Sequence, residues 1–354
     1  MREHTCAICG KHSLYISNAL GVCLDCIRAK PEALAHTARA HERARTQFDL
    51  PLKPPRSAGG IRCDQCANRC RMGDGAWGYC GLRMNVEGQL RSLVSTDSAL
   101  AHVYTDPLPT NCCAAWFCPG CTGYDQSTYR SVPEHHNLAV FFYGCNFDCL
   151  YCQNWSHKEI GAAPRIKKED LVGLALNPSV SCVCFFGGSP EPQLPFAIGA
   201  AESMLKEKST YICWEWNGCG NPKLVKRAAD LSAKSGGVVK FDLKAADPSL
   251  SMALSGVSNE MAFQNFAMLG ECKETLTATT LLVPGYVDAQ EVEGIARFIG
   301  EIDPQIPYSL LVFHPDFYMA DLPITPPSWV RECYRAAKRH LKRVNVGNKH
   351  LLTS

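Results

Sequence analysis

Three cysteines in the middle of the chain have the spacing of a metal-cluster site. Cys145, Cys149 and Cys152 form a C-x3-C-x2-C pattern within Gly-Cys-Asn-Phe-Asp-Cys-Leu-Tyr-Cys-Gln-Asn. A tetrahedral zinc ion or an electron-transfer 4Fe-4S cluster normally takes four ligands from the protein. Three closely spaced thiolates can instead hold a 4Fe-4S cluster and leave one iron open to another molecule.

The segment before the motif is expected to position it. Residues 137–143 are mostly apolar and aromatic, which predicts a buried strand and places the cysteines in the loop at its C-terminal end. In barrel-like α/β folds, active sites form at that edge of the sheet. The spacing and the position therefore agree on one candidate site.

The motif resembles the signature of the radical S-adenosylmethionine (radical SAM) enzymes. In that family the open iron is chelated by the amino and carboxylate groups of SAM, which is then cleaved to methionine and a 5′-deoxyadenosyl radical that abstracts a hydrogen atom. The resemblance implies that the three cysteines carry the catalytic cluster, and that the backbone of Tyr151 lies near the adenine. The alternative is a zinc knuckle or a chance run in a cysteine-rich chain.

Alternating strands and helices follow the motif. Strands are expected at residues 180–186, 210–216, 236–244, 275–283 and 308–313, with helices near 167–176, 194–206, 222–234 and 289–299. With residues 137–143 this gives about six strands, so we predict an α/β fold with an open (β/α)6 partial TIM-type barrel, as is typical of the family, rather than a closed (β/α)8 barrel. A helix at 328–339 and a strand-like segment at 343–350 are expected to end the chain.

Residues at the ends of these strands are candidate cofactor contacts. Gly187 and Gly188 follow a strand directly, and glycine lets backbone approach a ligand closely. They resemble the family's glycine-rich motif that binds the SAM amino group, although a Ser-Pro insertion leaves the contact of Glu191 open. Glu215 and Asn217 occupy the same edge on the next strand.

Two further strand ends carry polar side chains. Asp242 and Lys244 end an otherwise apolar strand, where charges are costly unless they are paired or face a ligand. A similar Asp-x-Lys lies by the SAM site in the activating-enzyme branch of the family; a structural ion pair is the alternative. His314 is a candidate catalytic contact with SAM or substrate, or else a buried histidine that satisfies backbone groups.

The cysteines upstream of the motif fall into three groups. The first is two C-x2-C knuckles thirteen residues apart, which favours one structural zinc while iron stays open. The second resembles an N-terminal extension of radical SAM proteins related to pyruvate formate-lyase-activating enzyme, and both a structural metal and an auxiliary iron–sulfur cluster fit it. The third, Cys112-Cys113 with Cys118 and Cys121, fits a further cluster, a cap or a redox pair. The first group is Cys6, Cys9, Cys23 and Cys26, and the second is Cys63, Cys66, Cys70 and Cys80.

Composition sets the domain organisation and the cellular setting. The chain has 354 residues, 46% hydrophobic content, 21 cysteines and a formal charge of +2, which favours metal sites over disulfides and gives no general attraction to nucleic acid or membrane. We predict a zinc-ribbon-like knuckle and helix at 1–50, a linker at 51–60, a cysteine-rich extension at 61–130 and the barrel at 131–354. A cytoplasmic protein is expected.

The resemblance implies an oxidoreductase that abstracts hydrogen from a protein or peptide, as the glycyl-radical-activating enzymes do, with flavodoxin or ferredoxin as reductant. Activating enzymes with extra clusters carry them after the motif, whereas here no cysteine lies between Cys152 and Cys182. Modification or methylation of a small molecule or protein is therefore the second hypothesis. The hypothesis from another class is a non-catalytic iron–sulfur and zinc protein that transfers electrons or binds a partner.

Overall fold

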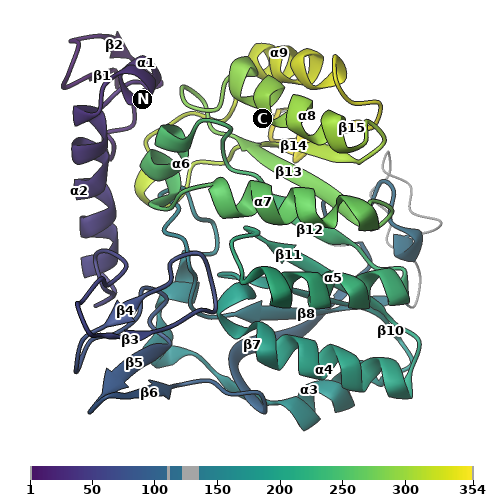
Figure 1. Cartoon of the computed structure of the whole chain (residues 1–354). Coiled ribbons are helices and arrows are strands. Elements are labelled where there is room, and N and C mark those ends of the chain that lie inside the picture. The colour runs from purple at the N-terminus through teal and green to yellow at the C-terminus, as the bar shows by residue number, and fades with distance from the viewer. Residues whose placement is uncertain (1, 110–111, 122–134, 353–354) are drawn as a thin grey trace.

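One mixed β-sheet forms the centre of the molecule. The structure is a computed structural model that describes residues 2–109, 112–121 and 135–352 (Figure 1). In these residues nine strands form the sheet in the order β15-β14-β13-β12-β11-β10-β8-β7-β9. Seven of them are parallel: β8 (His136–Phe142), β10 (Val180–Gly187), β11 (Tyr211–Trp216), β12 (Val239–Asp242), β13 (Leu276–Leu282), β14 (Tyr308–Val312) and β15 (Val344–Gly347).

The predicted open barrel is confirmed. All six expected strands are present, and each parallel strand pairs with the next one along the chain. The strand-like C-terminal segment joins them as β15, a seventh parallel strand. Within the described part of the chain, β9 and β15 end the sheet and do not pair with each other, so the barrel is partial.

Helices cover the outer face of the sheet, and the alternation of side chains along the strands explains why. Phe185, Trp214 and Phe241 are fully or almost fully buried on the outer face, where the ring centroids of Phe185 and Trp214 are 4.6 Å apart. The indole N–H of Trp214 donates to the carbonyl of Ala228 in a covering helix. The helices are α3 (Lys168–Ala175), α4 (Leu194–Glu207), α5 (Pro222–Ser235), α6 (Pro248–Ser255), α7 (Glu260–Met268), α8 (Ala289–Ile302) and α9 (Pro327–Lys338).

The cysteine-rich extension contributes a strand to the main sheet. β7 (Ser98–Pro107) pairs antiparallel with β8 over seven residue pairs, and its other edge pairs with β9 (Arg165–Lys167). The sequence analysis did not predict this strand. Two short hairpins precede it, β3 (Ile61–Arg62) with β4 (Arg71–Met72) and β5 (Arg83–Val86) with β6 (Gln89–Ser92). The boundary predicted at residues 130–131 lies outside the described residues.

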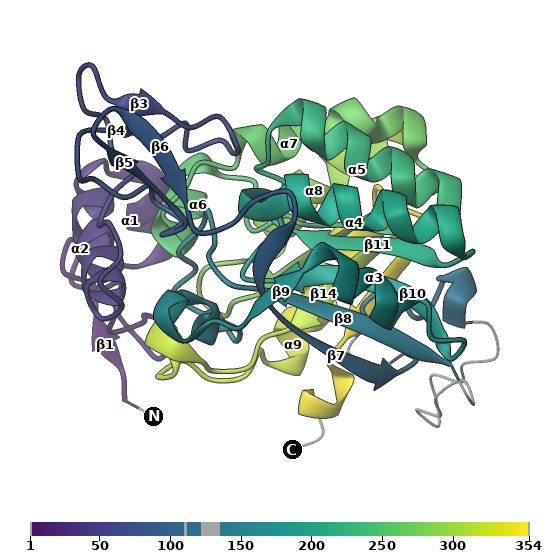
Figure 2. The ribbon, with the colours of Figure 1, turned by 90° about the horizontal axis from the view of Figure 1, so that it is seen from below.

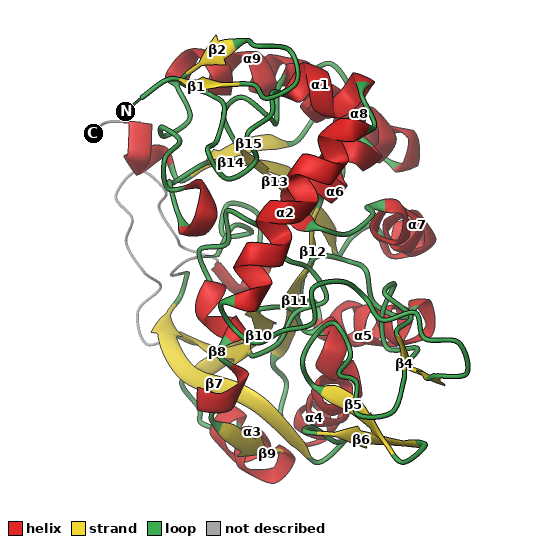
Figure 3. Ribbon diagram, turned by 90° about the vertical axis from the view of Figure 1, so that its left-hand side faces the viewer, coloured by secondary structure: helices red, strands yellow, loops and turns green. Residues whose placement is uncertain are grey.

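The N-terminal segment is a small ribbon followed by a long helix. The ribbon consists of β1 (His4–Thr5), β2 (His12–Ser13) and α1 (Leu24–Ala29), and α2 (Glu32–Thr46) crosses in front of the sheet in Figure 3. The expected polar helix is thus present, although its side chains at His41 and Arg45 are buried. Nowhere in the described chain does a helix have the length and apolar character needed to cross a bilayer.

Candidate cofactor site and metal centres

An open cavity of about 180 Å³ lies at the C-terminal ends of the parallel strands. Ten of the twelve residues predicted to be catalytic or to contact the cofactor line it, although they come from four strands and the loops after them. They are Cys145, Cys149, Tyr151, Cys152, Gly187, Gly188, Glu215, Asn217, Asp242 and Lys244.

The three motif cysteines lie together on one wall of this cavity. The loop turns inward at Gly144, whose φ is +78° and where a Cβ atom would come within 2.9 Å of the Cys80 carbonyl oxygen. The backbone N–H of Phe147 donates to Cys145 Sγ at 3.3 Å. Burial raises the pKa of all three thiols, that of Cys152 to about 12, while nearby Lys158 and Lys244 act in the opposite direction on Cys149 and Cys152. Thiol ligands lose their protons when a metal binds, and these cations would stabilise the thiolates.

The edge of the cavity at Gly187 and Gly188 is bare backbone. Gly187 has φ +110°, and a Cβ atom there would lie 2.5 Å from the backbone nitrogen of Phe142 on the next strand. At Gly188 a Cβ atom would lie 2.7 Å from both the Gly144 carbonyl oxygen and the His157 ring. Both positions therefore require glycine, because the neighbouring segments approach the backbone too closely for a side chain.

Replacing Gly188 by alanine is expected to destabilise the protein by about 1–3 kcal/mol, because the added methyl group enters space that is already filled. Gly173→Ala, in α3, is the matched control, since nothing lies within 4 Å of its Cβ position. Urea unfolding of both variants measures the difference. A Gly188→Ala variant as stable as the control would contradict the described packing.

Glu191 lies behind the cavity wall and does not line it. Its carboxylate is fully buried, accepts the backbone N–H of Gly218 at 2.8 Å and accepts the hydroxyl of Ser189. Glu191 thereby ties the loop after β10 to the loop after β11. Burial outweighs these hydrogen bonds and raises its pKa to about 7.

We expect the stability of the protein to fall as the pH rises towards 7, because folded Glu191 keeps a proton that the unfolded chain releases above its usual pKa near 4.5. The loss amounts to about 3 kcal/mol, at roughly 1.4 kcal/mol per pKa unit. Glu191→Gln retains an acceptor for Gly218 but does not titrate. Unfolding of both proteins between pH 5 and 8 measures the difference, and a pH-independent difference would contradict the burial of this charge.

Ion pairs form the cavity wall on the next strands. Lys244 Nζ lies 3.1 Å from Asp242 Oδ2, and Asp242 also accepts the hydroxyl of Thr279. Burial disfavours the charged carboxylate, but Lys244 and Lys240 together outweigh it, so the pKa of Asp242 lies below its usual value. Glu215 forms an ion pair with Lys240. The wall thus presents both a cation and an anion to a ligand.

Asn217 holds three loops together at the cavity wall. Its amide nitrogen donates to Asn146 Oδ1 at 2.7 Å and to Ser189 Oγ at 2.9 Å. By contrast, the side chain of His314 is exposed after β14 and does not line the cavity. The geometry therefore gives no support to a catalytic role for His314.

A buried charged cluster beside the cavity escaped the sequence analysis. Asp148, inside the cysteine motif, is fully buried and accepts His41 Nδ1 at 2.9 Å and Arg45 Nη1 at 3.5 Å, both from α2. Lys158 forms a third ion pair with it. Despite burial, these neighbours hold the pKa of Asp148 well below its usual value. The signal was an aspartate between two cysteines of the motif, but two of its three partners, His41 and Arg45, are more than 100 residues upstream.

His157 is another residue of the cavity that the sequence analysis missed. Its side chain is buried, and its Nδ1 has no hydrogen-bond partner. Burial and Lys158 lower its pKa to about 3, so the ring is neutral. It lies against Gly188 at the edge of the cavity.

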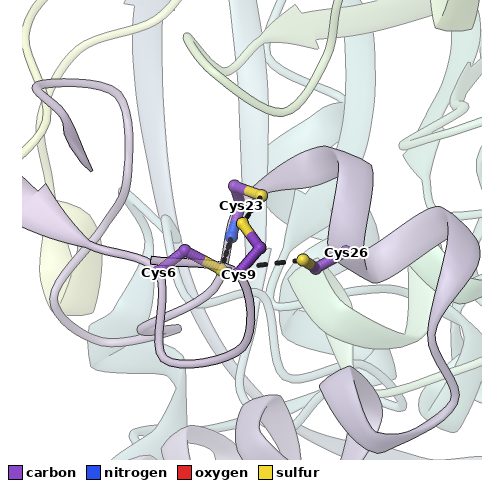
Figure 4. A group of neighbouring side chains, drawn as sticks. All are labelled: Cys6, Cys9, Cys23 and Cys26. Carbon is purple, nitrogen blue, oxygen red and sulfur yellow. Dashed lines mark hydrogen bonds between the residues drawn. The ribbon is translucent and has the colours of Figure 1, made fainter. Parts of the chain in front are cut away.

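The four cysteines of the ribbon form a metal-binding arrangement (Figure 4). All four sulfur atoms lie within 4.8 Å of one another, with 3.7 Å between Cys6 and Cys26 and between Cys9 and Cys23. An ion bound tetrahedrally at about 2.3 Å from each sulfur separates the sulfurs by roughly 3.8 Å. The predicted four-cysteine site therefore fits one metal ion.

The second group of cysteines surrounds a separate, small cavity of about 10 Å³, roughly the room that one water molecule needs. Cys63, Cys66, Cys70 and Cys80 all line it, and the backbone N–H of Tyr79 donates to Cys70 Sγ at 3.4 Å. Unlike the four sulfur atoms of the ribbon, these sulfur atoms do not all lie within 4.8 Å of one another in the described residues.

This cavity lies directly behind the cysteine motif. Asn68, between two of its cysteines, donates its amide to the Asn146 carbonyl at 2.7 Å. The Ala67 N–H donates to the Cys219 carbonyl at 2.8 Å. The Cys80 carbonyl packs against Gly144, immediately before Cys145.

Comparison with known proteins points in the same direction as this geometry. Residues 139–299 match the sequence model of the radical SAM superfamily. An uncharacterized protein of Methanocaldococcus jannaschii is 21% identical over 295 residues, which are 81% of this chain and 81% of that protein. Pyruvate formate-lyase-activating enzyme of Staphylococcus aureus is 26% identical over 185 residues, which are 49% of this chain and 73% of that enzyme.

Two solved structures have partial similarity. A domain of pyruvate-formate lyase-activating enzyme from Bacteroides vulgatus aligns with a TM-score of 0.38 and 18% identity, over 48% of this chain and 99% of that one. Streptococcus suis SuiB bound to its precursor peptide SuiA aligns with a TM-score of 0.45 and 16% identity, over 59% of this chain and 47% of that one.

Proposed function

Because the chain belongs to the radical SAM superfamily through residues 139–299, we propose that it cleaves S-adenosylmethionine reductively at a 4Fe-4S cluster held by Cys145, Cys149 and Cys152. The observation that carries the proposal is the convergence of these three cysteines with the residues of four strand ends on one cavity. When bound, the cluster supplies the electron that splits SAM into methionine and a 5′-deoxyadenosyl radical, which abstracts a hydrogen atom.

The chain's own residues bind and orient SAM. Gly187 and Gly188 would offer bare backbone to the amino and carboxylate groups of SAM, and the backbone of Tyr151 would lie near the adenine. Lys244 presents a cation to the ligand while Asp242 fixes the position of that cation, with Nζ 3.1 Å from Oδ2. Glu191 and Asn217 act as positioning residues, since their hydrogen bonds hold the loops that form the wall.

The proposed substrate is a protein or peptide. Support comes from the Staphylococcus aureus relative, a pyruvate formate-lyase-activating enzyme, of which the alignment covers 73%. The proposed reductant is flavodoxin or ferredoxin, and the proposed location is the cytoplasm.

We also propose that the first and second upstream groups of cysteines bind metal, a different kind in each group. The close tetrahedral spacing of Cys6, Cys9, Cys23 and Cys26 supports a single zinc ion. The wider arrangement of the second group around its own cavity supports an auxiliary iron–sulfur cluster. Its position behind Gly144 supports a role in passing electrons to the motif.

Anaerobic reconstitution tests the proposed reaction. The full chain is loaded with iron and sulfide, reduced with dithionite and given SAM, and 5′-deoxyadenosine and methionine are measured by mass spectrometry. We expect both products in equal amounts. A fully loaded protein whose spectrum does not respond to SAM and which forms neither product would reject the proposal and favour an electron-transfer protein.

A further inference from the structure

A third group of cysteines lies away from the cofactor cavity. Cys112, Cys118 and Cys121 come from the loop and the 3-10 helix η1 (Pro119–Cys121) that follow β7. Cys182 is the third residue of β10, whereas the cavity lies at the other end of that strand, beyond Phe186. Figure 2 shows the end of this loop, beside the grey trace, on the opposite side of the molecule from α2.

Cys118 and Cys121 form a knuckle like the one in the ribbon. The sulfur of Cys118 accepts the backbone N–H groups of Gly120 and Cys121, two and three residues further along. The sulfur of Cys6 accepts N–H groups from the same two relative positions. Backbone N–H groups directed at a sulfur favour the thiolate, which is the form that binds metal.

The other two thiols meet this knuckle from different directions. The thiols of Cys112 and Cys118 both lie close enough to the Cys121 thiol to raise its pKa. Cys182 is buried in one apolar cluster with Cys121, and Cys118 packs against that cluster; the Cys182 thiol donates to Asn137 Oδ1 at 3.2 Å, a bond that an ion would replace. The sulfur atoms of these four cysteines are more widely spaced than those of the ribbon, which all lie within 4.8 Å of one another. A bound ion would therefore draw the outer thiols together.

The neighbouring Cys113 faces elsewhere. The two adjacent cysteines, which could not easily reach one ion together, therefore do not have to. Its sulfur lies 3.1 Å from Lys240 Nζ, and Lys240 in turn pairs with Glu215 beside the cofactor cavity. Cys113 is therefore committed to a charged partner inside the barrel. Only Cys112 of the pair is available to the knuckle.

We propose that Cys112, Cys118, Cys121 and Cys182 bind one tetrahedral Zn²⁺ ion that fastens the loop after β7 to the barrel. Three ligands come from the loop and one from β10, so the ion joins two parts of the chain about 60 residues apart in sequence. Thiolate ligands suit zinc, and the packing of Cys118, Cys121 and Cys182 around one apolar cluster matches a single ion better than a bulky cluster. The site does not depend on the proposed radical chemistry.

Metal analysis of the full chain tests this site. The zinc content of wild type is compared with that of a Cys118→Ser, Cys121→Ser variant, and we expect the variant to lose one zinc per chain. A Cys6→Ser, Cys9→Ser variant should lose a different zinc, so combining the two pairs should remove two. Cys182→Ser should weaken zinc retention against a competing chelator, whereas Cys333→Ser in α9 should not.

A second measurement uses only the wild-type protein, so it tests the site even if the variants do not fold. Cysteine alkylation, read by peptide mass spectrometry, should show the four proposed ligands protected until a zinc chelator is added, while Cys272 reacts equally with and without chelator. Unchanged zinc content in a folded Cys118→Ser, Cys121→Ser variant would overturn the proposal. So would a Cys118–Cys121 disulfide in freshly reduced wild type, or a loss of iron and sulfide instead of zinc from the variant.

Discussion

Replacing Cys145, Cys149 and Cys152 together by alanine is expected to reduce 5′-deoxyadenosine formation to the background without enzyme. All three sulfurs lie on the wall of one cavity, and no other cysteine lines it among the described residues. Without them a 4Fe-4S cluster has no ligands there, so the iron content should fall by about four per chain. The assay combines product measurement with iron and sulfide analysis.

The iron that remains in this variant reports on the second group of cysteines. The second group of cysteines surrounds a separate cavity, so it should keep its metal when the motif is removed. A Cys272→Ala variant is the matched control, because Cys272 is half-buried in η5 (Leu269–Cys272), remote from the cavity wall. Product formation by the triple variant, or equal iron loss from the control, would contradict the assignment.

Replacing Asp148 by alanine is expected to destabilise the protein by about 3–5 kcal/mol, the usual cost of removing one partner from a buried ion pair. The carboxylate is fully buried and is the shared partner of His41, Arg45 and Lys158. Its removal leaves those groups buried without their anion. Urea unfolding at pH 7 measures the loss.

An exposed ion pair provides the control for this effect. Asp64 pairs with Arg62, and both side chains are more than half exposed. Asp64→Ala should cost less than about 1 kcal/mol, as surface pairs usually do. If the two aspartate variants unfold at the same urea concentration, the Asp148 cluster does not carry the stability inferred from its burial.

Local patterns predicted the barrel because each of its units is local. Hydrophobic runs ending in glycine or charged residues gave the strands, and parallel strands then align their ends on one cavity. β7 was missed because only its pairing with β8 makes it a strand of the sheet. The positions of Glu191 behind the cavity wall and of His314 away from the cavity likewise depend on long-range packing, so the sequence could not predict them.

The partners of Asp148 show the same limit more sharply. An aspartate within the cysteine motif is readily interpreted as a polar loop residue, and only the packing of α2 against the loop adds His41 and Arg45 to its neighbour Lys158. The contacts that decide its role join segments that the chain separates widely. No periodicity or spacing encodes such contacts.

The contact between α2 and the cysteine motif connects the N-terminal ribbon to the cavity. α2 follows the ribbon directly, and its His41 and Arg45 hold the loop that contains Cys149 through Asp148. If an ion that binds the ribbon also orders α2, it favours the loop conformation seen here. By reciprocity, a ligand bound at that loop would then increase the affinity of the ribbon for its ion by the same factor. The ribbon would then act as a thermodynamic effector of the cavity without contacting anything bound there.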